Sequence, residues 1–126
     1  MPKTENTCIR GCANVDMINK SIDQLKELQE DVTETCHLLS LTGNETRFKI
    51  LFLIKNNNRL CVCDMSDILG ISISAVSQQL SKLKKGGLLS NSKEGQTIYY
   101  SIAPNYTEKL DQLFIVHSSK IVTEAA

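Results

Sequence analysis

Apolar residues recur at intervals of three and four along the first half of the chain, which is the spacing of amphipathic helices. The first stripe begins near Asp16, the second ends at Gly43, and the third lies in a helix over residues 45–55 that Asn44 caps. We expect the third stripe, and Cys36 in the second, to belong to the core. The stripes are Ile18, Ile22, Leu25 and Leu28; Val32, Cys36 and Leu39; and Phe48, Leu51, Phe52 and Ile54.

Two further helical patterns and two alternating runs follow. Gly70 closes the first helix, and Ser72 caps a second that runs to about Lys85, so a tight glycine turn joins two helices. Residues 88–93 and 97–102 are extended runs around a glycine-containing turn, which predicts a hairpin, or wing. The apolar positions that carry these patterns are Val62, Met65 and Leu69 in the first helix and Ile98, Tyr100 and Ile102 in the last run.

Pro104 starts a final amphipathic helix, with Leu110, Leu113, Phe114 and His117 near one face. Residues 1–14 lack apolar periodicity, so we expect them to form a mobile arm that carries cysteines. The expected fold class is α+β, mainly α. It is a winged helix-turn-helix domain over residues 15–126 with extra N- and C-terminal helices, and those terminal helices are expected to form a homodimer interface.

The chain has 126 residues, which fits one small domain, and its formal net charge is zero. The basic excess is local, because residues 72–102 contain Lys82, Lys84, Lys85 and Lys93 against Glu94 alone. Such an excess, doubled in a dimer, can neutralise DNA phosphates. No apolar run approaches the roughly 18 residues of a membrane span, and no secretory signal is present. We therefore expect a cytoplasmic protein without membrane contact.

The helix after Ser72 has the composition of a DNA-recognition helix. Val76, Leu80 and Leu83 form its inward stripe, and hydroxyl, amide and lysine side chains occupy the opposite face. Such groups bond base edges and phosphates in the major groove. An ordinary surface helix remains an alternative, although the hairpin behind it favours DNA binding. The predicted DNA contacts are Ser72, Ser74, Ser77, Gln78, Gln79, Ser81, Lys82 and Lys85, with Lys93 and Gln96 on the wing.

Five cysteines, an odd number without a signal peptide, favour metal or thiol chemistry over a disulfide scaffold. Cys8 and Cys12 lie in the arm, and Cys61 and Cys63 lie where the first helix-turn-helix helix begins. We expect these four to be metal ligands, because thiolates select Cd(II), Pb(II), Zn(II), Hg(II) or Bi(III) over hard cations. Residues two apart on a helix do not face each other, so chelation by both requires Cys61 at or before the first turn.

At this point the sequence resembles the ArsR/SmtB metalloregulatory repressors, and specifically their CadC-type cadmium/lead sensors. The resemblance covers nearly the whole chain and implies a homodimer that represses a metal-resistance operon and leaves its operator when metal binds. It also implies that the cysteine arm comes from the other subunit. The segments that carry it are Thr46-Arg-Phe-Lys-Ile-Leu, Leu60-Cys-Val-Cys-Asp-Met-Ser-Asp-Ile-Leu-Gly, Ala75-Val-Ser-Gln-Gln-Leu-Ser-Lys-Leu and Gly95-Gln-Thr-Ile-Tyr-Tyr-Ser.

Many members of that family carry a second zinc site on the C-terminal helix. Here His117 matches one of its positions, but Pro104, Tyr106 and Lys120 stand where that site has Asp, His and Glu. The site is therefore dismantled, and sensing is expected to rest on sulfur. His117 is then a helix-face or dimer-interface residue, and His37 is interfacial or exposed.

The leading hypothesis is a non-enzymatic repressor that soft metal ions release from operator DNA. One alternative is a redox-switched winged-helix repressor in which a cysteine pair oxidises to a disulfide. Another is a small thiol oxidoreductase, although no βαβ pattern or Cys-x-x-Cys motif supports it. The last alternative is a permanent structural zinc site, in which case chelators would unfold the protein. No nucleotide-binding loop, acid pair or Ser-His constellation indicates an enzyme.

Overall fold

A computed structural model of the chain describes residues 13–114 and divides into two compact units, Met1–Leu38 and Leu39–Ala126. The first unit contains α1 (Val15–Glu27) and most of α2 (Gln29–Thr42). Asn14 caps α1 by accepting a hydrogen bond from the Met17 amide at 2.9 Å. No residue of α1 is buried. Its exposed apolar side chains include Val15, Met17 and Leu25, and Leu28 at its C-cap is exposed as well.

The prediction that Cys36 belongs to the core is wrong for this chain, because its side chain is exposed. The buried residues of α2 are Leu38 and Thr42 instead. The sequence stripe through Cys36 and Leu39 therefore marks the outer face of the helix, and Leu39 is 50% exposed. The spacing correctly predicted a helix. It did not identify the buried face of α2, because apolar residues occur on several of its faces.

The second unit begins with the last turn of α2 and continues through α3 (Glu45–Asn57), β1 (Leu60–Cys61), α4 (Val62–Leu69) and α5 (Ile73–Lys85). The predicted caps are confirmed. Asn44 Oδ1 accepts from the Arg47 amide at 3.0 Å, and Ser72 Oγ accepts from the Ala75 amide at 3.0 Å. Gly70 ends α4 at φ +68°, a left-handed conformation that glycine adopts without steric cost.

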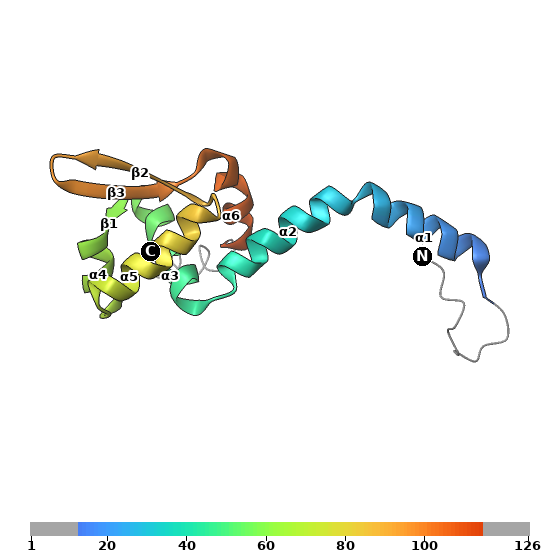
Figure 1. Ribbon diagram of the computed structural model, residues 1–126, viewed down its shortest axis with the longest axis horizontal. Coiled ribbons are helices and arrows are strands. Elements are labelled where there is room, and N and C mark those ends of the chain that lie inside the picture. The colour runs from blue at the N-terminus through green and yellow to red at the C-terminus, as the bar shows by residue number, and fades with distance from the viewer. Residues whose placement is uncertain (1–12, 115–126) are drawn as a thin grey trace, which may run out of the picture. The chain divides into compact units, whose positions relative to one another are not determined.

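The wing is a hairpin of β2 (Leu89–Glu94) and β3 (Thr97–Ile102), and β1 adds a short third strand, giving the order β1-β3-β2 (Figure 1). All pairs are antiparallel, with Cys61 opposite Tyr99 and Glu94 opposite Thr97. The structure thus confirms the predicted fold class for the chain, a mostly helical domain with a small winged sheet. The pairing of β1 with β3 joins the start of the helix-turn-helix to the wing.

The C-terminal part begins as a 3-10 turn, η1 (Pro104–Tyr106), and only then becomes α6 (Thr107–Leu113). The prediction that the α-helix begins at Pro104 therefore placed its start about one turn too early, since the α-helix begins at Thr107. Leu110 and Phe114 are fully buried, and His117 lies outside the described residues. The Phe114 ring packs edge-on against Phe48 at 4.9 Å and Phe52 at 5.6 Å between ring centroids.

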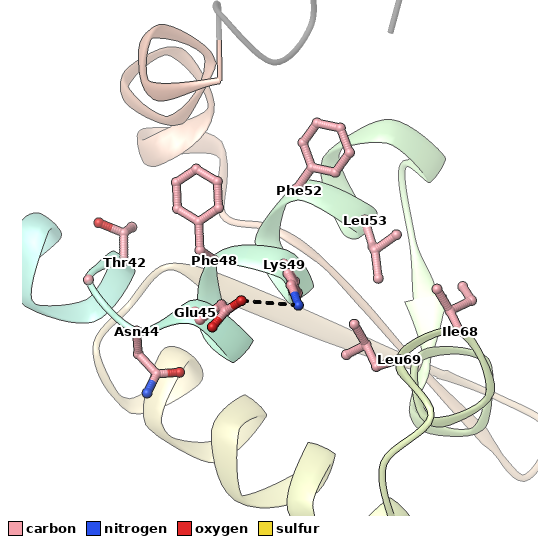
Figure 2. A pocket seen from close by; sticks show the side chains of 10 residues that line it. Thr42, Asn44, Glu45, Phe48, Lys49, Phe52, Leu53, Ile68 and Leu69 are labelled. Atoms are coloured by element: carbon pink, nitrogen blue, oxygen red, sulfur yellow. Dashed lines mark ion pairs between the residues drawn. The ribbon is translucent and has the colours of Figure 1, made fainter. Parts of the chain in front are cut away.

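Ile50, Leu51 and Ile54 form the buried face of α3, and Phe48 and Phe52 are only half-buried. The expectation that the whole third stripe is core is thus right for Leu51 and Ile54 and wrong for the two phenylalanines. Their rings line an apolar cleft of about 570 Å³ between α3 and α4, with Ile68 and Leu69 on its far side (Figure 2). Within residues 13–114 no helix is long and apolar enough to cross a membrane.

Candidate DNA interface and thiol pair

The predicted two-faced character of α5 is present in the structure. Val76, Leu80 and Leu83 are buried to 1% exposure or less. The opposite face is solvent-exposed, and the helix ends in a basic turn of Lys82, Lys84 and Lys85. The exposed predicted contacts on and beside α5 are Ser72, Ser74, Ser77, Gln78, Ser81, Lys82 and Lys85, and those on the wing are Lys93 and Gln96.

Gln79 differs from the other predicted DNA contacts. It is half-buried, and its amide oxygen accepts a hydrogen bond from the Arg47 guanidinium at 3.0 Å. That oxygen is used inside the domain rather than presented outward. Ser72 also has a structural bond, since its hydroxyl oxygen caps α5. Its hydroxyl hydrogen can still be donated to a phosphate.

Lys82→Ala should weaken DNA binding and flatten its salt dependence, because the slope of log affinity against log salt becomes shallower by about 0.9 for every phosphate that is no longer neutralised. Fluorescence anisotropy at several salt concentrations measures both quantities. Lys49→Ala is the matched control, since Lys49 is an exposed lysine on α3 paired with Glu45 at 3.4 Å. An unchanged slope in Lys82→Ala would remove this lysine from the phosphate-binding surface.

Arg59 links the segment before β1 to the tip of the wing. It lies just before β1, forms an ion pair with Glu94 at the end of β2, and stacks over the Tyr99 ring at 4.1 Å. A hydrogen bond and the positive charge of Arg59 lower the pKa of the Glu94 carboxyl from its ordinary value of 4.5. The pairing therefore contributes above that ordinary value and is lost only as pH falls through the lowered pKa. At neutral pH the anchor is intact.

Arg59→Gln should raise the Glu94 pKa back toward its ordinary value, because the hydrogen bond and the attraction are both removed. A carboxyl carbon NMR titration of the wild type and the variant measures this shift. Lys93→Gln, next to Glu94 on the same strand, is the control and should leave the pKa low. Identical Glu94 titrations in wild type and Arg59→Gln would show that the anchor does not form in solution.

The predicted thiol pair lies at the start of α4. Cys61 ends β1 and is the N-cap of α4, with extended backbone angles, so the sequence requirement that it precede the first turn is confirmed. Its amide donates to Asp64 Oδ2 at 3.4 Å in a capping-box arrangement. Cys63 is in the first turn and is exposed, and Cys61 is half-buried. Neither forms a disulfide.

Two thiols are a fitting but incomplete donor set for a soft metal ion. In the part of the chain that the structure describes, no group of three or more His, Cys, Asp or Glu side chains could hold a metal. The remaining predicted ligands, Cys8 and Cys12, lie outside the described residues. A complete site would therefore need donors from that segment or from a second chain.

Arg47 and Arg59 are the two polar residues of this region that sequence reasoning missed. Arg47 carried a signal, because it stands three and four residues before the buried Ile50 and Leu51, on the inward stripe of α3. An arginine on such a stripe needs hydrogen-bond partners inside the domain. Arg59 carried none, since its partners become neighbours only through the pairing of the strands.

A helix-turn-helix with a basic second helix and a hairpin wing defines a class, the winged helix-turn-helix DNA-binding regulators. Residues 44–91 match the family described as bacterial regulatory protein, arsR family. The cadmium resistance transcriptional regulatory protein CadC of Listeria innocua is 30% identical over 95 residues, covering 75% of this chain and 78% of that protein. The chain belongs to the ArsR family of transcriptional regulators.

Two further similarities cover the sequence and the fold. A CadC homolog from Staphylococcus aureus is 28% identical over 95% of this chain and 98% of its own length. The solved structure of reduced HlyU from Vibrio cholerae superimposes with a TM-score of 0.67 at 31% identity, covering 73% of this chain and 97% of that one. These proteins are regulators rather than enzymes, so the thiol oxidoreductase alternative is excluded.

Proposed function

We propose that the chain is a homodimeric repressor that binds operator DNA when metal-free and releases it when a thiophilic metal ion is captured by cysteine thiolates, so that metal-resistance genes are expressed. The observation that carries the proposal is the free Cys61 and Cys63 pair at the start of α4, the helix that precedes the DNA-reading helix. Relatives named as cadmium resistance and arsenical resistance regulators support it. Acting on operator DNA, the protein would be cytoplasmic.

DNA would be held by α5 in the major groove and by the wing beside it. Gln78, with exposed serines at positions 74, 77 and 81 of the same helix, is the exposed amide suited to bidentate contact with adenine. The last turn of α5, with its three lysines, and Lys93 on the wing would contact phosphates. A dimer would present two such helices to half-sites about one DNA turn apart.

The effector would be bound by Cys61 and Cys63 together with Cys8 and Cys12. A sulfur-only set admits Cd(II), Pb(II), Zn(II), Hg(II) and Bi(III) and ignores Mg(II) and Ca(II). The ligand positions are compatible with joint binding because Cys61 precedes the helix and Cys63 is in its first turn. The arm donors would come from the partner subunit, so that capture links the two subunits.

Capture at the start of α4 would alter DNA binding because α4 is connected to α5 by the short turn at residues 70–72 and also packs against it. A change in the tilt of α4 is then passed to α5, and binding is weakened at both half-sites together. The required coupling is about 1 to 3 kcal/mol, or roughly 5- to 150-fold in affinity. By reciprocity, operator DNA weakens metal binding by the same factor.

The test is anisotropy of a labelled operator duplex, selected from random DNA with the reduced metal-free protein and then titrated with Cd(II), Pb(II), Zn(II) or Hg(II). Release by at least one soft ion, together with thiolate-to-metal charge-transfer absorption, is the expected result. Mg(II) is the negative control. A reduced protein that holds its operator through all four titrations would rule out the metal-released repressor.

The second candidate is a thiol redox switch on the same fold. It is favoured by the exposure of Cys63 and by the likeness to a structure titled reduced HlyU. Oxidation of the Cys61 and Cys63 thiols to a disulfide, with two electrons passing to a cellular oxidant, would then release DNA. Absence of charge-transfer absorption with Cd(II), together with DNA release after mild oxidation that dithiothreitol reverses, would favour this candidate.

A further inference from the structure

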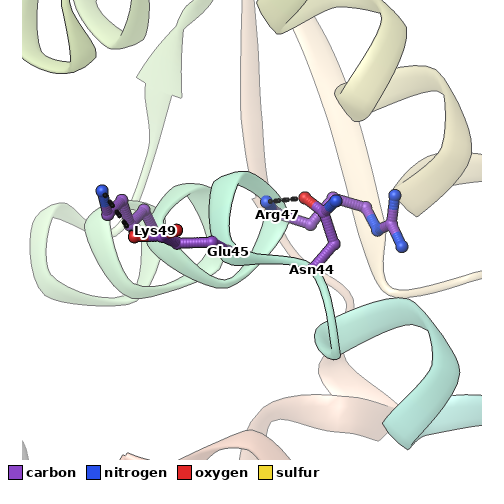
Figure 3. A network of polar contacts seen from close by, with 4 residues as sticks. All are labelled: Asn44, Glu45, Arg47 and Lys49. Atoms are coloured by element: carbon purple, nitrogen blue, oxygen red, sulfur yellow. Dashed lines mark hydrogen bonds and ion pairs between the residues drawn. The ribbon is translucent and has the colours of Figure 1, made fainter.

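Arg47 occupies the point where three helices meet. Its amide is capped by Asn44 at the start of α3, and its side chain leaves α3 on the side away from the Glu45–Lys49 ion pair (Figure 3). The guanidinium Nε donates to the Leu41 carbonyl at 2.7 Å, and Nη2 donates to the Ser40 carbonyl at 3.4 Å. These carbonyls belong to the last turn of α2, where helical partners are missing.

The remaining guanidinium bond goes to α5. Arg47 Nη1 donates to Gln79 Oε1 at 3.0 Å, across 32 positions of sequence. Gln79 lies between Gln78, which is exposed, and Leu80, which is buried. The bond therefore acts on α5 at the boundary between its core face and its DNA face, and it sets the rotation of the helix about its own axis.

The last turn of α2 also contacts α5 directly, at the end of α5. The Leu41 side chain packs directly on Gly86, so that a Cβ on that glycine would overlap Leu41 Cδ1. The last turn of α2 is thus linked to α5 indirectly through Arg47 of α3, near the middle of α5, and directly through Leu41 at the C-cap of α5. Two contacts along one helix fix its direction as well as its rotation.

We infer that Arg47 is a positioning residue for operator recognition. It holds α5, through Gln79, in the orientation that presents Gln78 and the neighbouring serines to base edges. The inference deepens the proposed function, since it rests on α5 as the DNA-reading helix. It also gives Gln79 a different role from the direct DNA contact expected from the sequence, because its amide oxygen is already bonded to Arg47.

A direct phosphate contact by Arg47 is the rival explanation for any loss of binding. Three of its nitrogens already donate to acceptors inside the domain, and its side chain is half-buried. A residue that orients base-reading groups affects specific binding, whereas a phosphate contact affects specific and non-specific DNA alike. The two roles are therefore separable by measurement.

The experiment compares Arg47→Gln, Gln79→Met and the double variant on the selected operator duplex and on a scrambled duplex, at several salt concentrations. Gln79→Met removes the acceptor and keeps the side-chain length. Lys49→Gln is the control, because it removes a cation from the other side of α3 (Figure 3). Arg47→Lys keeps the positive charge but loses the several N–H donors of the guanidinium group. Urea unfolding verifies that each variant is folded.

Each single variant should lose about tenfold in operator affinity, the effect of one hydrogen bond to a charged group, with scrambled-duplex affinity and the salt slope unchanged. The double variant should lose no more than the larger single loss, because both changes break the same link. Arg47→Lys should fall between wild type and Arg47→Gln, and Lys49→Gln should bind as wild type does.

Four results would overturn the inference. They are unchanged operator binding by Arg47→Gln, unchanged operator binding by Gln79→Met, equal loss on both duplexes with a shallower salt slope, or single losses that multiply in the double variant. Wild-type protein that selects no duplex at all would instead defeat the proposed function, and this inference with it.

Discussion

Replacing Cys61 or Cys63 with serine should leave operator affinity within about twofold of wild type and abolish release by Cd(II), a response expected at roughly 5- to 150-fold. The fold is retained because serine is a favourable N-cap, so Cys61→Ser keeps the cap of α4. Metal response is lost because a hydroxyl is a poor ligand for soft ions. Anisotropy of the labelled operator, with and without Cd(II), measures both effects.

Cys36→Ser is the matched control for these variants. Cys36 is likewise a free cysteine, exposed on α2, so the substitution removes a thiol of similar accessibility from another element. It should respond to Cd(II) as wild type does. If Cys61→Ser and Cys63→Ser both keep the full response, the thiols of α4 have no part in sensing. If Cys36→Ser alone loses it, the site lies on α2.

Phe114→Ala should lower the free energy of unfolding by about 3 to 5 kcal/mol, the usual range for truncating a buried phenylalanine. Phe114 is fully buried, and its ring packs edge-on against Phe48 and Phe52. Its removal takes away both contacts and opens a void beside the apolar cleft that those two rings line (Figure 2). Urea denaturation followed by circular dichroism measures the change.

Two companion variants keep this prediction decisive. Phe114→Leu fills part of the space and should lose less than Phe114→Ala, so a folded sample is retained even where alanine is too severe. Gln112→Ala, at an exposed position of α6, should change stability by no more than about 0.5 kcal/mol. A loss below about 1 kcal/mol in Phe114→Ala would mean that this ring is not packed in solution.

Local signals in the sequence were sufficient for most of the second unit. Asn44, Ser72 and Gly70 were identified as helix boundaries from their side chains and conformational preferences, and each performs that role. The hairpin followed from two extended runs around Gly95. These features are local because the residues that decide them are neighbours in sequence, so no knowledge of tertiary contacts was required.

Features that depend on distant contacts were harder to predict. The pairing of β1 with β3 occupies two residues, which is too short for an alternating pattern, and Cys36 was assigned to a face that the chain leaves open. Gln79 was grouped with the DNA contacts because amides suit base edges. Its partner, Arg47, is 32 residues away and becomes visible only in the folded domain.

Cys61 both ends a strand of the sheet and caps α4, which would restrict how the metal preference of the proposed thiolate site could be altered. The backbone of Cys61 pairs with Tyr99 of β3 and its side chain begins α4, so a replacement must suit both roles, as serine does, whereas Cys63 is not part of the sheet. Engineers who wish to retune this scaffold toward harder or softer ions should therefore vary position 63 first. Position 61 allows only side chains that also begin a helix well.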